Sequence, residues 1–247
     1  MKFIHKLVNF NSKKDDKFYN ELKNIIGFKP KSLDYYRVAF THRSAKKVDE
    51  KGNPINYERL EFLGDAMLGA VIASYLYKKV PSGNEGYLTQ MRSKVVSREH
   101  LNELGKELEL IKFVESSISS SKFGENVHGN IFEALIGAIY LDRGYKFCHK
   151  FINKRVIKPH VDIPKLEGKI TSYKSLLIEW CQKQKKQFKF DVYEDTGNDK
   201  LKHFSVKLFV DEKLVSKGRA TSKKKAEEIA SKRAYYAFRK QMKSKSK

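Results

Sequence analysis

Apolar and polar residues follow two different periods along the 247-residue chain. Between Asp15 and Lys154 the apolar residues mostly recur every three or four positions, which is the spacing of one face of an α-helix. After a helical segment at 171–183 they alternate with polar residues in 188–193 and 204–210, as in half-buried strands. A short strand near Leu214 and a long helical pattern follow. This change of period predicts an α+β fold, with an all-α domain before a small α-β-β-β-α domain.

The same pattern predicts where the two domains begin and end. We expect the helical domain at 15–160, a linker at 161–168 and the second domain at 169–240, because VDIPKLEG at 161–168 is typical of a linker. Residues 115–127 contain five serines and are predicted as a loop. The predicted helices lie at 15–26, from Asn56 to before Pro81, and at 85–97, 98–108, 128–141, 146–154 and 222–239.

One predicted helix carries three acidic residues on one side. In NYERLEFLGDAML, from Asn56 to Leu68, the side chains of Glu58, Glu61 and Asp65 fall within an arc of about 60°. The helix is apolar nearly all round, so we expect it to be buried. Buried carboxylates are costly unless they are compensated, and oxygen-rich clusters suit hard cations such as Mg²⁺. Solvated acids, or ion pairs with residues such as Arg59, are the alternative interpretation.

A second apolar helix repeats this arrangement. In HGNIFEALIGAIYL, from His128 to Leu141, Asn130 and Glu133 lie about 60° apart. Glu133 is the only ionisable residue other than Tyr140 between Ile131 and Leu141. The small residues Ala134, Gly137 and Ala138 would let another helix approach closely. A lone glutamate paired with a buried Arg or Lys is the alternative here.

The net charge of the chain indicates which class of partner it binds. The chain has 51 Lys+Arg against 29 Asp+Glu, a formal charge of +22, which favours a polyanion such as nucleic acid. The segment 169–247 alone has 22 Lys+Arg and 9 Asp+Glu, or +13. No apolar run is long enough for a membrane span, so we expect no membrane association. Two cysteines without metal-site spacing, Cys148 and Cys181, favour a reducing cytoplasm.

Three segments of the first domain resemble the ribonuclease III family. ERLEFLGD at 58–65 closely resembles the family signature, AFTHRSA at 39–45 resembles the stretch before it, and EALIG at 133–137 resembles the end of the second motif. The resemblance implies a homodimeric endonuclease that uses Mg²⁺, with Mn²⁺ as an alternative, to hydrolyse both strands of double-stranded RNA. It implies 5′-phosphate and 3′-hydroxyl ends and a cytoplasmic role in processing ribosomal RNA and other transcripts.

The resemblance also implies residue roles. Metal binding is expected from Glu61, Asp65, Asn130 and Glu133, and catalysis from Asp65 and Glu133. Glu58 and Glu85 are secondary (second-tier) candidates, and Glu85 is included on fold analogy alone. The family usually carries Asp where this chain has Asn130. An amide oxygen can ligate a hard cation, but it brings no charge.

The end of the chain resembles a double-stranded-RNA-binding domain. GRATSKKKAEEIASKRA begins with the motif at 218–227, although Ala220 replaces its second Gly, and Ile178 stands where Gln is common. The motif places positive charge where free N–H groups at a helix start already favour phosphate. The RNA-binding candidates are Lys200, Lys202, Ser222, Lys223, Lys224 and Lys225.

Two other functions compete with this interpretation. One is a double-stranded-RNA-binding protein with a degenerate nuclease core that does not cleave, and Asn130 keeps this alternative open. The other is a metal-dependent phosphohydrolase of small nucleotides, against which the basic C-terminal domain argues.

Overall fold

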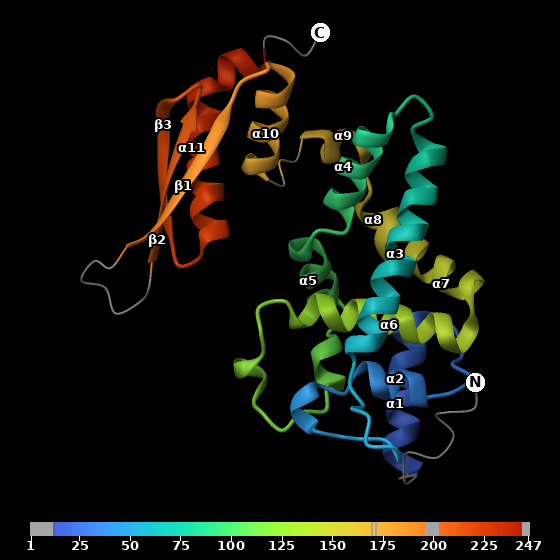
Figure 1. Cartoon of the computed structure of the whole chain (residues 1–247). Helices are drawn as coiled ribbons and strands as arrows, with labels where there is room; N and C mark the ends of the chain where they lie inside the picture. The colour runs from blue at the N-terminus through green and yellow to red at the C-terminus, as the bar shows by residue number, and fades with distance from the viewer. Residues whose placement is uncertain (1–11, 169, 171, 196–202, 244–247) are drawn as a thin grey trace. The chain divides into compact units, whose positions relative to one another are not determined.

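A computed structural model describes residues 12–168, 170, 172–195 and 203–243 (Figure 1). The chain divides into two compact units, Met1–Lys169 and Ile170–Lys247. The first unit is helical and the second combines two helices with a three-stranded antiparallel sheet. The predicted α+β fold class is therefore confirmed.

The first unit follows the predicted order of helices with small changes at their ends. Its first half contains α1 (Ser12–Ile26), α2 (Asp34–Ala39), η1 (Arg43–Ala45), α3 (Glu58–Lys79), α4 (Glu85–Val95), α5 (Arg98–Glu107) and η2 (Leu110–Phe113). Its second half contains η3 (Ser120–Lys122), α6 (Val127–Arg143), α7 (Tyr145–Ile152), η4 (Asn153–Ile157), α8 (Lys158–His160) and α9 (Ile163–Gly168). The predicted serine-rich loop thus includes one short 3₁₀ turn, η3.

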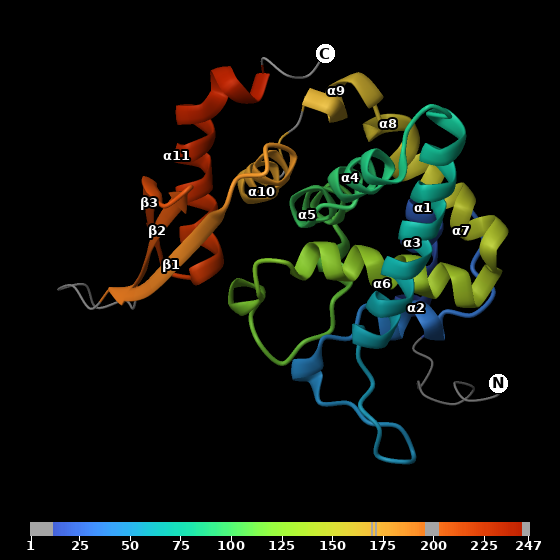
Figure 2. The same cartoon turned by 45° about the horizontal axis from the view of Figure 1, so that its top comes forward.

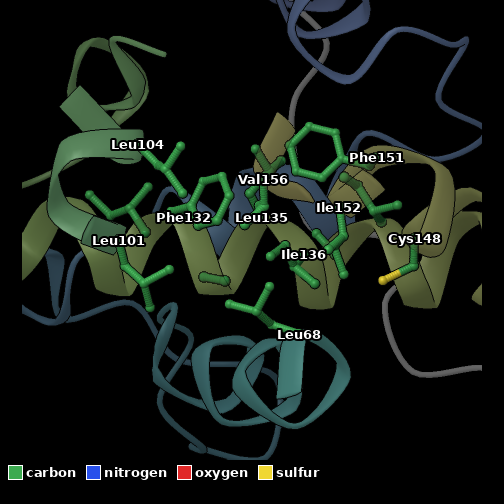
Figure 3. Packing of buried hydrophobic residues seen from close by; sticks show 14 of the residues in the cluster. Leu68, Leu101, Leu104, Phe132, Leu135, Ile136, Cys148, Phe151, Ile152 and Val156 are labelled. Atoms are coloured by element: carbon green, nitrogen blue, oxygen red, sulfur yellow. The ribbon is translucent and has the colours of Figure 1, made fainter. Parts of the chain in front are cut away.

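The core of this unit forms where α3 crosses α6. Leu68 of α3 and Phe132, Leu135 and Ile136 of α6 are fully buried, and Figure 3 shows Leu68 directed at α6. Gly137 makes the crossing close, because a Cβ there would lie 2.3 Å from the main-chain oxygen of Leu60. The predicted close approach at Gly137 is confirmed.

The expected burial of the two apolar helices is confirmed for α6 and wrong for α3. Most residues of α6 from Ile131 to Ile139 are buried, but α3 has an open side on which Phe62 is 80% exposed and Tyr77 72% exposed. Its other side packs on α6. By length and composition α3 is also the one helix among the described residues that fits a membrane span, yet its inner side belongs to this core.

The segment that we interpreted as a linker contains helix α9, which packs against α4. Leu166 is buried in this contact. The Nζ of Lys94, itself only 5% exposed, donates to the main-chain oxygen of Leu166 at 2.7 Å. The hydroxyl of Tyr87 donates to Oε1 of Glu167 at 2.7 Å. These contacts attach α9 to the helical unit.

The second unit contains α10 (Tyr173–Lys183), β1 (Phe188–Asp195), β2 (His203–Val210), β3 (Lys213–Ala220) and α11 (Lys223–Lys243). The sheet has the order β1-β2-β3, and α11 packs on β2, β3 and α10 (Figure 2). Val206 and Leu208 of β2 meet Ala226 and Ala230 of α11 in its core. The third strand, predicted as short, is as long as the other two.

Candidate active site

Five of the acidic or amide candidates face one cavity. The cavity has a volume of about 730 Å³ and is lined by Glu58, Glu61 and Asp65 of α3 and by Asn130 and Glu133 of α6. The two helices that were predicted to carry the acidic residues therefore contribute to one site. The sixth candidate, Glu85, does not line this cavity. It begins α4, where its Oε1 accepts a hydrogen bond from the Thr89 hydroxyl at 3.1 Å.

The acidic residues of α3 and α6 line one cavity because the two helix backbones nearly touch at Gly64. A Cβ at Gly64 would lie 1.7 Å from the main-chain oxygen of Glu133, so only glycine fits there. Glu61 and Asp65 lie on α3 next to this contact. Their carboxylates consequently line the same cavity as that of Glu133.

Charge and burial act together on Glu133. Burial raises the pKa of its carboxyl from 4.5 to about 7, and the negative charges of Asp65 and Glu61 add to the rise, while Arg98 opposes it. Burial also raises the pKa of Glu61, with Glu58 adding to the effect and Arg98 opposing it. The site thus holds more negative charge than its own cations compensate.

This donor set fits a hard divalent cation. Carboxylate and amide oxygens suit hard cations such as Mg²⁺, and a cation would compensate the negative charges of Asp65 and Glu61, which add to the rise that burial causes in the Glu133 pKa. Within the described ranges, no three His, Cys, Asp or Glu side chains come close enough to hold an ion as they stand. Mutual repulsion of carboxylates favours such separation in a cavity open to solvent.

Several further residues that line the cavity were not predicted from the sequence, among them His42, Tyr57, Arg98 and Asn102. Tyr57 is 6% exposed and precedes Glu58 in the signature, so its position in the motif is the signal that could have found it. Burial raises the pKa of its hydroxyl, the Asn130 side chain opposes that rise, and the negative charges of Glu61 and Glu58 add to it. Arg98 and Asn102 come from α5, and no motif marks them.

The lysine run of the second unit lies as predicted at a helix start. Ser222 precedes α11, and its Oγ accepts a hydrogen bond from the backbone N–H of Lys225 at 3.3 Å. The side chains of Lys223, Lys224 and Lys225 are exposed in the first turn. Positive charge thus coincides with the positive end of a helix dipole, an arrangement that favours phosphate. The candidates Lys200 and Lys202 lie outside the described residues.

Comparison with known proteins agrees with both units. Residues 34–160 match the family described as Ribonuclease-III-like, and residues 173–236 match the Double-stranded RNA binding motif. The nuclease domain of ribonuclease III from Campylobacter jejuni has a TM-score of 0.50 and 29% identity, covering 58% of this chain and 97% of that chain.

Similarity to two curated relatives extends over nearly the whole chain. The protein named Ribonuclease 3 of Zunongwangia profunda is 66% identical over 242 residues, which cover 98% of this chain and 100% of that protein. The Ribonuclease 3 of Flavobacterium psychrophilum is 64% identical over 239 residues, covering 96% and 97%. The chain therefore belongs to the ribonuclease III family, endoribonucleases in which a nuclease domain precedes a double-stranded-RNA-binding domain.

Proposed function

We propose that the cavity between α3 and α6 hydrolyses both strands of double-stranded RNA with Mg²⁺ as cofactor, Mn²⁺ being an alternative, and leaves 5′-phosphate and 3′-hydroxyl ends. The observation that carries this proposal is the convergence of Glu61, Asp65, Asn130 and Glu133 on one cavity whose carboxylates are under-compensated. Divalent ions bound there would supply activation of a water molecule and stabilisation of the departing oxygen.

The residues differ in what they contribute. Glu61, Asp65 and Glu133 would hold the ions with charged oxygens, and Asp65 and Glu133 are assigned the catalytic role as well. Asn130 would add a neutral oxygen. Glu58 is second-tier, since its Oε1 lies 4.0 Å from Nη1 of Arg43 at the exposed rim. Glu85 remains second-tier, at a position outside the cavity.

The second unit would hold the duplex by its phosphates. Lys223, Lys224 and Lys225 present three positive charges beside the free N–H groups of α11, and Ser222 adds a hydroxyl. A duplex RNA offers phosphates across its major groove and 2′-hydroxyls in its minor groove, so such contacts bind by shape and not by sequence. Lys200 and Lys202 are assigned to the same function from the sequence.

A homodimer is supported by the open side of α3. The exposed Phe62 borders a second cavity, of about 760 Å³, whose lining includes the apolar side chains of Tyr35, Val38, Leu63 and Leu141. A large exposed aromatic beside an apolar cavity is typical of an interaction surface. A region of the Campylobacter jejuni nuclease domain is described as involved in dimer formation. Two copies related by a two-fold axis would address the two antiparallel strands symmetrically.

We assign the cellular role to the processing of ribosomal RNA and other transcripts in the cytoplasm. Both cysteines, Cys148 and Cys181, are free and buried, which suits a reducing compartment. The basic second unit suits structured RNA as a substrate.

Incubation of the purified protein with end-labelled duplex RNA, with and without Mg²⁺, tests the proposed function. We expect Mg²⁺-dependent cleavage of both strands, with products that polynucleotide kinase labels only after phosphatase treatment, because their 5′ ends carry phosphate. A protein that retains the duplex in a gel shift but leaves both strands intact at every Mg²⁺ concentration would instead be the non-cleaving binding protein.

A further inference from the structure

Asn130 lies in the first turn of α6, a turn that the preceding residue does not cap. The first backbone N–H groups of a helix have no partner within the helix, and the side chain of the residue before it usually accepts one of them. The residue before α6, Asn126, makes no such bond with its side chain. The N–H of Gly129, a buried residue next to Asn130, therefore needs an acceptor from another element.

Asn102 of α5 supplies that acceptor. Its Oδ1 accepts a hydrogen bond from the backbone N–H of Gly129 at 2.8 Å, and its Nδ2 donates to Oδ1 of Asn126 at 3.3 Å. A backbone N–H can only donate, so the oxygen of the Asn102 amide has to face Gly129 and its NH₂ group has to face Asn126. Asn102 thus caps α6 from the neighbouring helix.

The two hydrogen bonds of Asn102 both end close to Asn130. Gly129 precedes Asn130 in the chain. Asn126 is joined to Asn130 directly, because its main-chain oxygen accepts a hydrogen bond from the backbone N–H of Asn130 at 3.0 Å. Loss of the Asn102 side chain would therefore loosen the backbone of Asn130 from two directions at once.

Glu133, one turn later on α6, is held by a different helix. Its main-chain oxygen lies against Gly64 of α3, at the close crossing described above. The close contact with α5 lies earlier on α6, since a Cβ at Gly105 would be 2.1 Å from the main-chain oxygen of His128. Helix α3 consequently fixes the turn that carries Glu133, whereas α5 fixes the turn that carries Asn130.

We propose that Asn102 is a positioning residue for Asn130: by capping α6 from α5, it holds the first turn of α6 where the Asn130 side chain contributes to the cation site. This inference rests on the proposed function, because it assumes that the cavity binds a divalent ion. It assigns Asn102 an effect on metal binding that passes through Asn130 and leaves the contribution of Glu133 unchanged.

A double-mutant cycle on metal binding tests the inference. Mn²⁺ affinity of the metal-free full chain is measured by the loss of free Mn²⁺ signal in electron paramagnetic resonance, for the parent, Asn102→Ala, Asn130→Ala and the double variant. We expect Asn102→Ala to weaken binding roughly three- to tenfold, the value of one hydrogen bond. In the Asn130→Ala background the same change should have little effect, because the ligand that Asn102 positions is already gone.

Two outcomes would overturn the inference: an unchanged Mn²⁺ affinity in Asn102→Ala, or an equal loss in both backgrounds, which would mean that Asn102 does not act through Asn130. Tyr36→Phe is the matched control for the loss of a buried hydrogen bond. Its hydroxyl donates to Oδ2 of Asp142 at 2.9 Å, and neither residue lines the cavity, so this change should lower thermal stability and leave Mn²⁺ affinity unchanged. Absence of saturable Mn²⁺ binding in the parent would contradict the proposed function instead.

Hydrogen exchange in the metal-free parent keeps the inference testable even if a variant folds poorly. The amide resonance of Gly129, assigned with glycine-selective isotope labelling, should exchange slowly, because the group is buried and hydrogen-bonded to Asn102. In Asn102→Ala the same amide should exchange faster. Exchange in the parent as fast as that of an unstructured peptide would show that Asn102 does not cap α6 and would contradict the inference.

Discussion

Gly64 of α3 lies against the main-chain carbonyl of Glu133 in α6, so closely that a Cβ on Gly64 would be 1.7 Å from that oxygen. This contact sets the distance between the two acidic helices. The contact should matter for the stability of the domain and also for metal binding, since the residues on either side of it line the proposed metal site. Widening the crossing would therefore affect both.

Replacing Gly64 by Ala should destabilise the nuclease domain by more than about 2 kcal/mol, because backbone on both sides has to shift. Gly69→Ala is the matched control on the same helix. A Cβ there meets nothing within 4 Å, so this change should stabilise by about 0.5–1 kcal/mol through helix propensity alone. Urea unfolding of the two variants measures both effects. Equal free energies of unfolding for the two variants would show that the helix crossing accommodates a Cβ at Gly64.

The raised pKa of Glu133 makes stability depend on pH in the metal-free protein. Because its pKa rises from 4.5 to about 7 on folding, the folded protein binds more protons than the unfolded chain between these values. The free energy of unfolding should then fall as pH rises through this window. Thermal melts of the parent and Glu133→Gln in a chelator give the contribution as a difference. A difference that is flat from pH 4.5 to 7 would contradict the pKa shift.

Changing Lys223, Lys224 and Lys225 to Ala should weaken duplex binding uniformly across sequences. Each lost phosphate contact should reduce the slope of log K against log salt by roughly 0.9, the value for B-DNA. The control removes the same charge from Lys189, Lys207 and Lys217, which lie on the face of the sheet away from α11. Filter binding at several salt concentrations compares the two triple variants. If their slopes are equal, net charge alone accounts for binding and α11 has no special role.

The contact between α9 and α4 predicts where the nuclease domain can be cut. A shortened protein ending at Asp162 leaves the Nζ of Lys94 without the carbonyl of Leu166, whereas one ending at Gly168 keeps it. We expect the longer protein to be more stable by about 1–3 kcal/mol, the cost of an unsatisfied buried donor. Lys94→Met should reduce this difference in urea unfolding. Identical midpoints for the two lengths would mean that α9 contributes nothing.

The acidic residues could be predicted from the sequence because helical periodicity places Glu58, Glu61 and Asp65 on one side of a helix. The extent to which α3 is buried could not be predicted from the sequence. An apolar residue such as Phe62 gives the same sequence pattern whether another element covers it or leaves it exposed. Local sequence patterns did not predict helix α9 either. Pro164 suggests a break, yet proline is tolerated in the first turn of a helix.

The contribution of α5 to the site could not be predicted from local sequence patterns either, for a different reason. Arg98 and Asn102 reach the cavity only because α5 packs on α6. A Cβ at Gly105 would lie 2.1 Å from the main-chain oxygen of His128, so this second close crossing determines their place. Such pairings join distant segments, and no motif within either segment encodes them.

Asn130 should set how much Mg²⁺ the enzyme needs. Asn130→Asp adds a fourth carboxylate and should lower the concentration required for full rate, while Asn130→Ala should raise it and slow cleavage. Single-turnover cleavage of a duplex across a Mg²⁺ titration provides these values. A titration of Asn130→Ala that overlays the parent would show that Asn130 is not a ligand.

The same titration applied to Glu133→Gln tests whether the cavity between α3 and α6 is a metal-dependent active site. Removing this charge should slow cleavage by more than about 100-fold, beyond the cost of losing a residue that only supports a ligand. Duplex binding, measured in parallel, should be unchanged, because the lysines proposed to bind RNA lie in the other domain. Glu103→Gln, an exposed position on α5, should cleave at the parent rate. If Glu133→Gln cleaves like the parent at every Mg²⁺ concentration, the cavity between α3 and α6 is not the active site.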